Sequence, residues 1–316
     1  MADIAVIGAG AWGTALAIHA HRAGHRVTLW ARDPASIKDR INPRLPGHPI
    51  PDAIQVGAIQ VGPMPGAADA VLVAVPVRHV AAVLGMAMPA GPLVLCAKGL
   101  HDGRFPLEIA GGIRPGPAAM LTGPNFAHEV AAGLPAAAVV ASDDPGLRAA
   151  LLAMLGTGSF RLYGGSDPVG AQVGGAAKNV VAIAAGVAIG AGLGENARAA
   201  LVTRGLAEIG RLAVSLGGRA ATVMGLSGLG DLLLTCTGPA SRNFQLGLAL
   251  GRGGDVRAIL ASTTHAVEGV AAAPALTARA VGVDLPVIAT VAALLDGRVG
   301  VRGAMESLLA RPGRHE

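Results

Sequence analysis

A glycine-rich turn close to the N-terminus is the feature that most constrains what this chain can fold into. Residues 8–13 (GAGAWG) directly follow a short apolar run typical of a buried parallel strand, and they open a segment of helical composition. In such a G-x-G-x-x-G turn, Gly8 permits the tight turn, Gly10 lets the backbone approach a pyrophosphate, and Gly13 allows the helix to pack on the strand. The start of the helix adds N–H groups and a partial positive charge. In a chain with 47 glycines the pattern alone is weak, but its position favours a dinucleotide ligand over a ligand-free turn.

Apolar runs that alternate with helical segments fill the first half of the chain. Strands are expected at residues 4–7, 26–30, 70–75, 93–97, 118–122, 137–141 and 160–163. A helix is expected at residues 147–155, because Asp144 can cap it and Pro145 suits its first position. This alternation predicts an α/β fold with a Rossmann-type, doubly wound parallel sheet over residues 1–165, in which the Pro/Gly-rich residues 43–65 form a loop region.

The character of the sequence changes near Gly164-Gly165. Beyond this point Ala/Leu/Gly segments have helical spacing, and we predict an all-α domain over residues 166–316. One of its helices has an apolar face made of Val202, Leu206, Ile209, Ala213 and Leu216. The charged residues of that helix, among them Glu208, are expected to point away from this face.

Composition limits the classes of function. Only 2% of the 316 residues are aromatic, and no run of arginines accompanies the net charge of +5, so a nucleic-acid partner is not expected. Cys96 and Cys236 lie in apolar stretches, and no cysteine or histidine spacing suits a metal, which indicates a reduced, cytoplasmic protein without a metal. No leader is expected before the first strand, which starts at Asp3. The uncharged residues 179–194 are too short for a span of about 20 residues, so they predict a buried helix and no integral membrane segment. A homodimer is compatible with the sequence.

Lysine is unusually rare, because the 25 basic residues comprise 22 arginines and only Lys38, Lys98 and Lys178. A GC-rich coding bias explains the excess of arginine. A lysine that remains can still mark a site that arginine cannot serve, because only lysine can release its proton in a protein. Lys98 follows the strand at 93–97, and open α/β sheets bind ligands at the carboxyl ends of their strands. The next strand ends in a turn at Gly123 that could meet the same ligand; a surface lysine and an ordinary turn are the alternatives.

Lys178 and Asp231 each lie in an apolar stretch. Lys178 precedes the longest uncharged run of the chain, where burial would lower its pKa into a range useful for proton transfer; the alternative is a lysine at a helix end. Asp231 lies in GLGDLLLTC (228–236), and a buried carboxylate needs a cationic or hydrogen-bonding partner. Lys178 is the obvious candidate, although Asp231 could also cap a helix.

The end of the second strand is expected to select the cofactor. An acidic residue there binds the ribose hydroxyls of NAD, whereas an arginine accepts the 2′-phosphate of NADP. Arg32 comes first and Asp33 follows it, so NADPH is favoured, and an exposed Arg–Asp turn is the alternative.

Residues 241–243 provide a capping hydroxyl, a guanidinium and an amide in succession. Ser241, Arg242 and Asn243 suit a phosphate pocket and a plain helix start equally well. Glu268 could accept a hydrogen bond from a cofactor hydroxyl or only cap a helix.

Together these motifs resemble the bacterial NAD(P)-dependent glycerol-3-phosphate dehydrogenase family. The resemblance covers nearly the whole chain and rests on segments in the same order: GAGAWGTALA (8–17), AKG (97–99), TGPNFAHEVAAGLP (122–135), AAKNVVAIAAG (176–186), NARAALVTRGLAEI (196–209), GLSGLGDLLLTC (225–236), SRNFQLG (241–247) and VEG (267–269).

The resemblance implies the reversible reduction of dihydroxyacetone phosphate to sn-glycerol 3-phosphate for phospholipid synthesis. Lys178 resembles the proton donor and acceptor, with Asp231 holding it. The residues that resemble substrate contacts are Lys98, Gly123, Asn125, Lys178, Asp231, Ser241, Arg242 and Asn243. Those that resemble cofactor contacts are Gly8, Gly10, Ala11, Trp12, Gly13, Arg32, Asp33, Lys98, Ala127, Arg242 and Glu268.

The chain departs from the family pattern at two positions. The family usually has Ser or Thr where Asn125 stands, and a basic or polar residue where Asp33 stands, which leaves use of both cofactors open. Two other functions fit the residues alone. A dehydrogenase of hydroxy acids could bind a carboxylate at residues 241–243. A non-catalytic NAD(P)-binding module would leave Lys178 and Asp231 unexplained.

Overall fold

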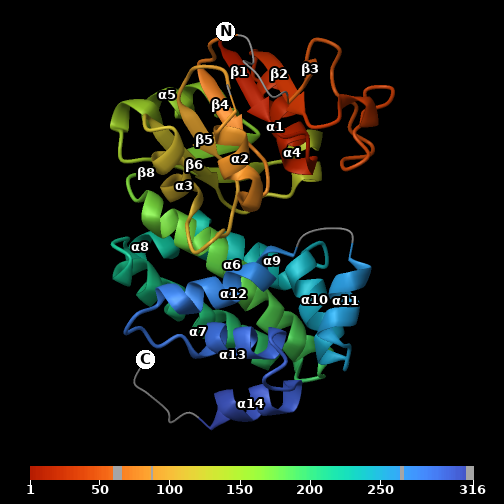
Figure 1. Cartoon of the computed structure of the whole chain (residues 1–316), viewed down its shortest axis with the longest axis vertical. Coiled ribbons are helices and arrows are strands. Elements are labelled where there is room, and N and C mark those ends of the chain that lie inside the picture. Colours follow the sequence, from red (N-terminus) through yellow and green to blue (C-terminus); the bar gives the residue numbers. More distant parts are fainter. Residues whose placement is uncertain (60–65, 87, 264–266, 311–316) are drawn as a thin grey trace. The chain divides into compact units, whose positions relative to one another are not determined.

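The computed structural model describes residues 1–59, 66–86, 88–263 and 267–310, and the chain divides into two compact units (Figure 1). The first unit contains residues 1–98 and 104–172, and the second contains residues 99–103 and the chain from residue 173 onwards. The sequence predicted a boundary after residue 165. The division falls instead inside helix α6 (Pro168–Gly190), because its first residues belong to the first unit, where Ala171 packs in an apolar cluster on the sheet.

An eight-stranded sheet forms the centre of the first unit. Its strands are β1 (Asp3–Ile7), β2 (Arg26–Ala31), β3 (Gln55–Ala58), β4 (Ala70–Val73), β5 (Leu93–Leu95), β6 (Ala118–Thr122), β7 (Ala136–Ala141) and β8 (Phe160–Gly165). Their order is β3-β2-β1-β4-β5-β6-β7-β8, so the chain builds outward from β1 and then continues from β4 on the other side. This is the doubly wound arrangement of the Rossmann fold, as predicted.

The sheet differs from the prediction in two details. All neighbouring strands are parallel except β6 and β7, which are antiparallel, so the sheet is mixed. The sequence did not reveal this, because an apolar strand buried on both faces looks alike in either direction. The region 43–65 is also not all loop, since β3 pairs with β2 at the sheet edge; residues 60–65 lie outside the described residues. This strand was missed because it has little apolar character, and its Gly57 is required because a Cβ there would lie 2.8 Å from the Trp30 ring.

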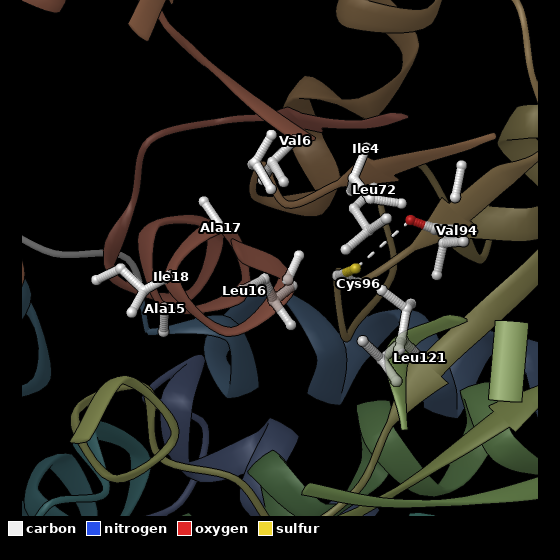
Figure 2. Packing of buried hydrophobic residues seen from close by; sticks show 14 of the residues in the cluster. Ile4, Val6, Ala15, Leu16, Ala17, Ile18, Leu72, Val94, Cys96 and Leu121 are labelled. Carbon is white, nitrogen blue, oxygen red and sulfur yellow. Dashed lines mark hydrogen bonds between the residues drawn. The ribbon is translucent and has the colours of Figure 1, made fainter. Parts of the chain in front are cut away.

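Helices cover this sheet and complete its core. They are α1 (Ala11–Arg22), α2 (Val80–Leu84), α3 (Pro106–Ile113), α4 (Ala127–Ala132) and α5 (Pro145–Leu155), with the short turns η1 (Pro34–Ser36) and η2 (Val77–His79). Figure 2 shows Leu16 of α1 directed toward Leu72 of β4 and toward Cys96, which directly follows β5. The Cys96 thiol donates to Val94 O at 3.4 Å, and burial raises its pKa to about 12, so this thiol stays protonated. The predicted cap of α5 is confirmed: Asp144 Oδ1 accepts from the N–H groups of residues 146 and 147.

Every regular element in the described part of the second unit is helical. Its elements are the greater part of α6, then α7 (Gly194–Ser215), α8 (Ala220–Val223), the π-helical turn η3 (Leu226–Gly230), α9 (Asp231–Thr237), α10 (Arg242–Gly251), α11 (Val256–Ser262), α12 (Glu268–Arg279), α13 (Pro286–Leu295) and α14 (Val301–Leu309). With 23 residues and a mean hydropathy of 1.5, α6 is long and apolar enough to cross a membrane by length and composition, and 89% of its apolar window is buried inside the protein. The prediction of a buried helix is confirmed, but the argument from shortness is wrong, because the helix starts at Pro168.

Four glycines bring α6 and α10 into backbone contact. A Cβ at Gly186 would lie 2.2 Å from Phe244 O, and one at Gly247 would lie 2.1 Å from Ile183 O. Gly190 and Gly251 make the same kind of contact one helical turn further along. A Cβ at either position would lie 2.3 Å from a carbonyl oxygen of the facing helix. Any side chain at these positions would force the two helices apart.

Glu208 of α7 does not point to solvent, as the sequence predicted. Glu208 is only 1% exposed. Its carboxylate accepts hydrogen bonds from the N–H groups of Val287 at 2.7 Å and Ile288 at 3.1 Å, in the first turn of α13. Burial raises the pKa of this carboxyl to about 7, and the two N–H bonds oppose the rise. The periodicity of α7 correctly predicts the burial of Ile209 and Ala213, but it contains no information about a second helix that begins on its flank.

Candidate active site

The glycine-rich turn has the shape that a dinucleotide needs. Gly8 has φ +110°, and a Cβ there would lie 2.8 Å from Ala74 O; a Cβ at Gly13 would lie 1.9 Å from Gly8 O. At Gly10, by contrast, no described residue other than its chain neighbours has a heavy atom within 4 Å of the Cβ position, so this side of the turn is open. Helix α1 starts directly after Gly10 without a side-chain cap, which presents the N–H groups of Ala11 and Trp12. The turn therefore fits a pyrophosphate on the helix start.

Arg32 and Asp33 follow β2 and are both exposed. Asp33 has a local task, because its Oδ1 accepts from Ala35 N at 3.2 Å and so caps η1. The exposed Arg–Asp turn that the sequence offered as an alternative is therefore present, and the structure adds that Asp33 caps it. The Arg32 guanidinium is the cation that this strand end presents.

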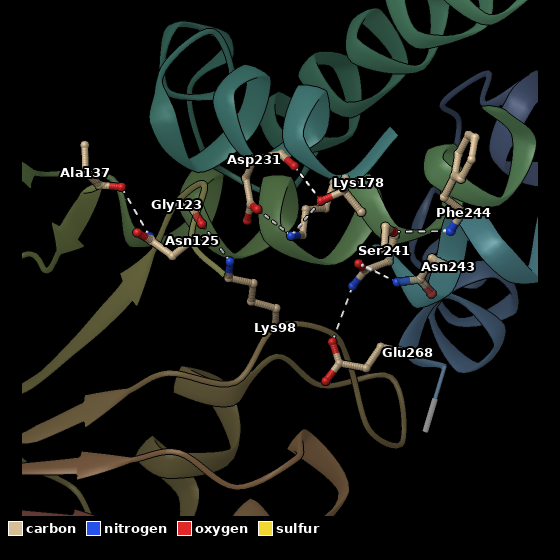
Figure 3. A network of polar contacts seen from close by, with 12 residues as sticks. Lys98, Gly123, Asn125, Ala137, Lys178, Asp231, Ser241, Asn243, Phe244 and Glu268 are labelled. Atoms are coloured by element: carbon tan, nitrogen blue, oxygen red, sulfur yellow. Dashed lines mark hydrogen bonds and ion pairs between the residues drawn. The ribbon is translucent and has the colours of Figure 1, made fainter. Parts of the chain in front are cut away.

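Lys98, Gly123 and Asn125 lie together at the carboxyl edge of β5 and β6 (Figure 3). Lys98 Nζ donates to Gly123 O at 2.9 Å. Gly123 has φ +146°, and a Cβ there would lie 2.9 Å from the backbone of Ala138, so only glycine fits. Asn125 donates through Nδ2 to Ala137 O at 3.2 Å, and its Oδ1 is buried without a hydrogen-bond partner in the structure. Ala127 then opens α4.

In the second unit, Lys178 is held by a carboxylate and a hydroxyl. Lys178 Nζ donates to Asp231 Oδ1 at 2.5 Å and to Thr235 Oγ1 at 3.0 Å, and the two charged side chains are only 9% and 2% exposed. The Thr235 hydroxyl donates to Asp231 O at 2.6 Å. The predicted pairing of Lys178 with Asp231 is confirmed. Thr235 was missed, although its spacing four residues after Asp231 places it on the same helical face.

Close backbone contacts bring this pair together. Lys178 lies in the middle of α6 and not at a helix end, and Asp231 opens α9 after the π-helical turn η3. Gly174, one turn before Lys178, would carry a Cβ 2.7 Å from Ser227 O, and a Cβ at Gly228 would lie 2.0 Å from Val223 O. Gly174 lets η3 approach α6, and Gly228 lets η3 pack against the end of α8. Together these contacts place the Asp231 carboxylate at the lysine.

The start of α10 combines a cap with an exposed cation. Ser241 Oγ accepts from Phe244 N at 3.2 Å and caps the helix, so the helix-start interpretation of Ser241 is confirmed. Arg242 is the first helical residue and is exposed. An arginine at a helix N-terminus attracts anions through both its fork of donors and the helix dipole.

Asn179 links two other predicted site residues (Figure 3). Asn243 Nδ2 donates to Asn179 Oδ1 at 2.9 Å, and Asn179 Nδ2 donates to Glu268 Oε2 at 3.4 Å. Asn243 Oδ1 also accepts from Gly269 N at 3.0 Å, which fixes the start of α12. The sequence analysis did not single out Asn179. The one hint in the sequence is that its amide side chain directly follows Lys178.

These residues define a class of protein. A glycine turn shaped for a dinucleotide, a buried lysine held by a carboxylate, and a helix start that carries an arginine are typical of a nicotinamide-dependent dehydrogenase.

Comparison with known proteins identifies the family within that class. Residues 3–148 and 167–306 match the N-terminal and C-terminal models of NAD-dependent glycerol-3-phosphate dehydrogenase. The chain is 51% identical over 322 residues to the glycerol-3-phosphate dehydrogenase (NAD(P)+) of Gluconobacter oxydans, covering 99% of this chain and 98% of that protein. It is 52% identical over 326 residues to the enzyme of the same name from Acidiphilium cryptum, with the same coverage. The crystal structure of glycerol-3-phosphate dehydrogenase from Coxiella burnetii superimposes with a TM-score of 0.89 at 34% identity, covering 98% of this chain and 99% of that one.

The chain therefore belongs to the NAD-dependent glycerol-3-phosphate dehydrogenase family. This confirms the resemblance, the oxidoreductase class, and a nicotinamide dinucleotide, NAD or NADP, as the cofactor of the family.

Proposed function

We propose that the protein catalyses the reversible reduction of dihydroxyacetone phosphate to sn-glycerol 3-phosphate, with NADPH favoured over NADH. The observation that carries the proposal is the buried cluster of Lys178, Asp231 and Thr235 in a chain of this family.

Lys178 supplies the proton in this reaction. When bound, the nicotinamide supplies the hydride that reduces the C2 carbonyl. Negative charge develops on the carbonyl oxygen, and Lys178 Nζ stabilises it and donates a proton to it; in the reverse direction Nζ takes the proton back. Asp231 and Thr235 orient the ammonium, and Asp231 favours its charged form.

Other residues bind the phosphate and orient the carbonyl. Arg242 and the α10 N-terminus, with Ser241 as its cap and Asn243 behind it, supply donors for the phosphate. In the first unit, Lys98 and Asn125 are the proposed substrate contacts at the carboxyl edge of the sheet. Binding the phosphate, which does not react, restricts the carbonyl to a productive orientation.

The proposed cofactor contacts are the positions that the family resemblance implied. Residues 8–13 bind the pyrophosphate. Arg32 binds the 2′-phosphate, which is the basis for favouring NADPH. Ala127 and Glu268 complete the proposed contacts through the start of α4 and the link to Asn179.

A substrate panel tests the reaction. Purified protein should oxidise NADPH, and more slowly NADH, with dihydroxyacetone phosphate, and should leave keto acids unreduced. Turnover with a keto acid but not with dihydroxyacetone phosphate would favour a hydroxy-acid dehydrogenase, and cofactor binding without any turnover would favour a binding module.

A lysine replacement tests the role of Lys178. Lys178→Arg keeps the charge but cannot donate a proton, so turnover should fall by about 10²-fold or more. Lys38→Arg is the matched control, because Lys38 is exposed and should leave turnover unchanged. Near-normal turnover of Lys178→Arg would contradict the assignment.

We also propose that the product serves phospholipid synthesis in the cytoplasm. Glycerol phosphate is the backbone that phospholipids share, so isotope-labelled product made in a cell extract should appear in newly formed phospholipid.

A further inference from the structure

Asn42 contacts the glycine-rich turn from the connection between β2 and β3. Asn42 is only 2% exposed, and its Nδ2 donates hydrogen bonds to Ala9 O at 3.0 Å and to Thr14 Oγ1 at 2.6 Å. Ala9 is the residue between the first two glycines of the turn, and Thr14 lies in the first turn of α1, with its N–H bonded to Gly10 O at 3.0 Å. One amide group therefore joins the turn to the start of the helix.

The bond to Ala9 O determines where a neighbouring donor points. The Ala9 carbonyl and the Gly10 N–H belong to the same planar trans peptide, so they point in opposite directions. Holding the carbonyl toward Asn42 turns the Gly10 N–H to the other side, and at Gly10 the Cβ position is open. This restraint matters because Gly8 and Gly10 flank Ala9, and glycine has the greatest backbone freedom.

Asn42 is itself held in place by a folded segment. Its Oδ1 accepts from Arg44 N at 2.9 Å. Two residues before it, Arg40 has φ +62° and donates to the carbonyls of Ile50 at 3.1 Å and Ile54 at 2.7 Å. A positive φ at a residue other than glycine persists only where the surrounding structure fixes it.

Apolar contacts complete this segment. Leu45, Ile50 and Ile54 are almost fully buried and belong to the same apolar cluster as Leu16 of α1. The connection is thus anchored both to the core and to the turn.

We propose that Asn42 is a positioning residue for the cofactor: it fixes the Ala9–Gly10 peptide so that the turn binds the pyrophosphate. The inference rests on the proposed role of residues 8–13. It adds a residue from outside the glycine motif that determines how well this motif works.

Replacement of Asn42 tests the inference through the cofactor alone. Asn42→Asp is nearly isosteric, removes both donated hydrogen bonds, and sets a carboxylate against the Ala9 carbonyl. The Kd for NADPH, measured by titration calorimetry, should rise at least about tenfold, because the turn loses its restraint and a buried carbonyl loses its donor. The KM for NADPH should rise by a similar factor, whereas kcat and the KM for dihydroxyacetone phosphate should stay within about twofold.

Ser142→Ala is the matched control. Ser142 is also 2% exposed and donates to a backbone carbonyl of the same unit, Ala118 O, at 2.7 Å, but it follows β7 and does not contact the turn. This variant should lower the melting temperature and leave the Kd for NADPH unchanged. If Asn42→Asp behaves in the same way, Asn42 is only structural and the inference is wrong.

Thr14 variants decide the question if Asn42→Asp does not fold. Thr14→Val removes one of the two acceptors of Asn42 Nδ2, and Thr14→Ser keeps the hydroxyl. We expect the Kd for NADPH to rise about threefold in Thr14→Val and to stay near wild type in Thr14→Ser; equal affinities would overturn the inference. Failure of the wild-type protein to bind NADPH would instead contradict the proposed function.

Discussion

The buried ion pair between Lys178 and Asp231 leads to a quantitative prediction about stability. Asp231→Asn leaves a buried ammonium without its carboxylate, and Lys178→Met leaves a buried carboxylate without its ammonium. Because an uncompensated buried charge is strongly unfavourable, each single change should lower the free energy of unfolding by about 3–5 kcal/mol. With both changes made together no charge remains, and the loss should be only about 1 kcal/mol, because a buried ion pair hardly outweighs its own desolvation.

The expected signal is large enough to measure without ambiguity. At about 2–4 °C per kcal/mol for a domain of this size, each single variant should melt roughly 6–20 °C below the wild type. Urea unfolding followed by circular dichroism at the helical band measures the loss, because both side chains lie on helices of the second unit; the helices of the first unit contribute to the same band. Lys38→Met removes an exposed lysine and should change nothing.

The double variant decides whether the reasoning holds. A double-mutant cycle should give a coupling energy of about 5–9 kcal/mol, since the second replacement removes the charge that the first one left unpaired. If the loss in the double variant equals the sum of the two single losses, the two side chains do not compensate each other, and the electrostatic account of the site is wrong.

Two further predictions concern the glycine-rich turn and Glu208. Gly13→Ala should destabilise the first unit, because the new Cβ would lie 1.9 Å from Gly8 O. Gly10→Ala should keep the wild-type melting temperature but weaken NADPH binding at least about tenfold. Equal melting temperatures of the two variants would contradict the packing role of Gly13. The pKa of Glu208 rises from 4.5 to about 7 on folding, so the folded state binds more protons and stability should fall as the pH rises through that interval, by roughly 3 kcal/mol. Glu208→Gln should flatten this dependence in unfolding curves recorded between pH 4 and 8, and an unchanged slope would show that Glu208 is not its source.

The sequence predicted those parts of the molecule that depend on local patterns. The strand–turn–helix at residues 8–13 and the cap at Asp144 follow from glycine spacing and capping chemistry, and the structure confirms both. The pairing of Lys178 with Asp231 was also within reach, because a buried charge in an apolar stretch requires a partner of opposite sign, and few were available.

The rest depends on contacts that local patterns do not contain. Glu208 was placed in solvent because its helix shows only where its own apolar residues lie, and not that α13 begins beside it. Asn42 and Asn179 act through amide groups on distant segments, and an amide in a sequence carries no sign of which carbonyl it will meet. The direction of β7 likewise depends on the path of the chain and not on its composition.

The contacts between α6 and α10 have a consequence for how this protein can change over time. Lys178 lies on the first of these helices and Asn243 on the second, and their separation is set by glycine backbones and not by side chains. In an ordinary core, a larger residue can be accommodated when a neighbouring side chain is replaced by a smaller one. Here the neighbouring atoms belong to the backbone, which no substitution can make smaller. In a lineage whose codons favour alanine, each of these glycines is one nucleotide change from alanine, and no second substitution nearby can compensate for that change. We therefore expect Gly186 and Gly247 to resist drift even where the surrounding alanines, valines and leucines exchange freely.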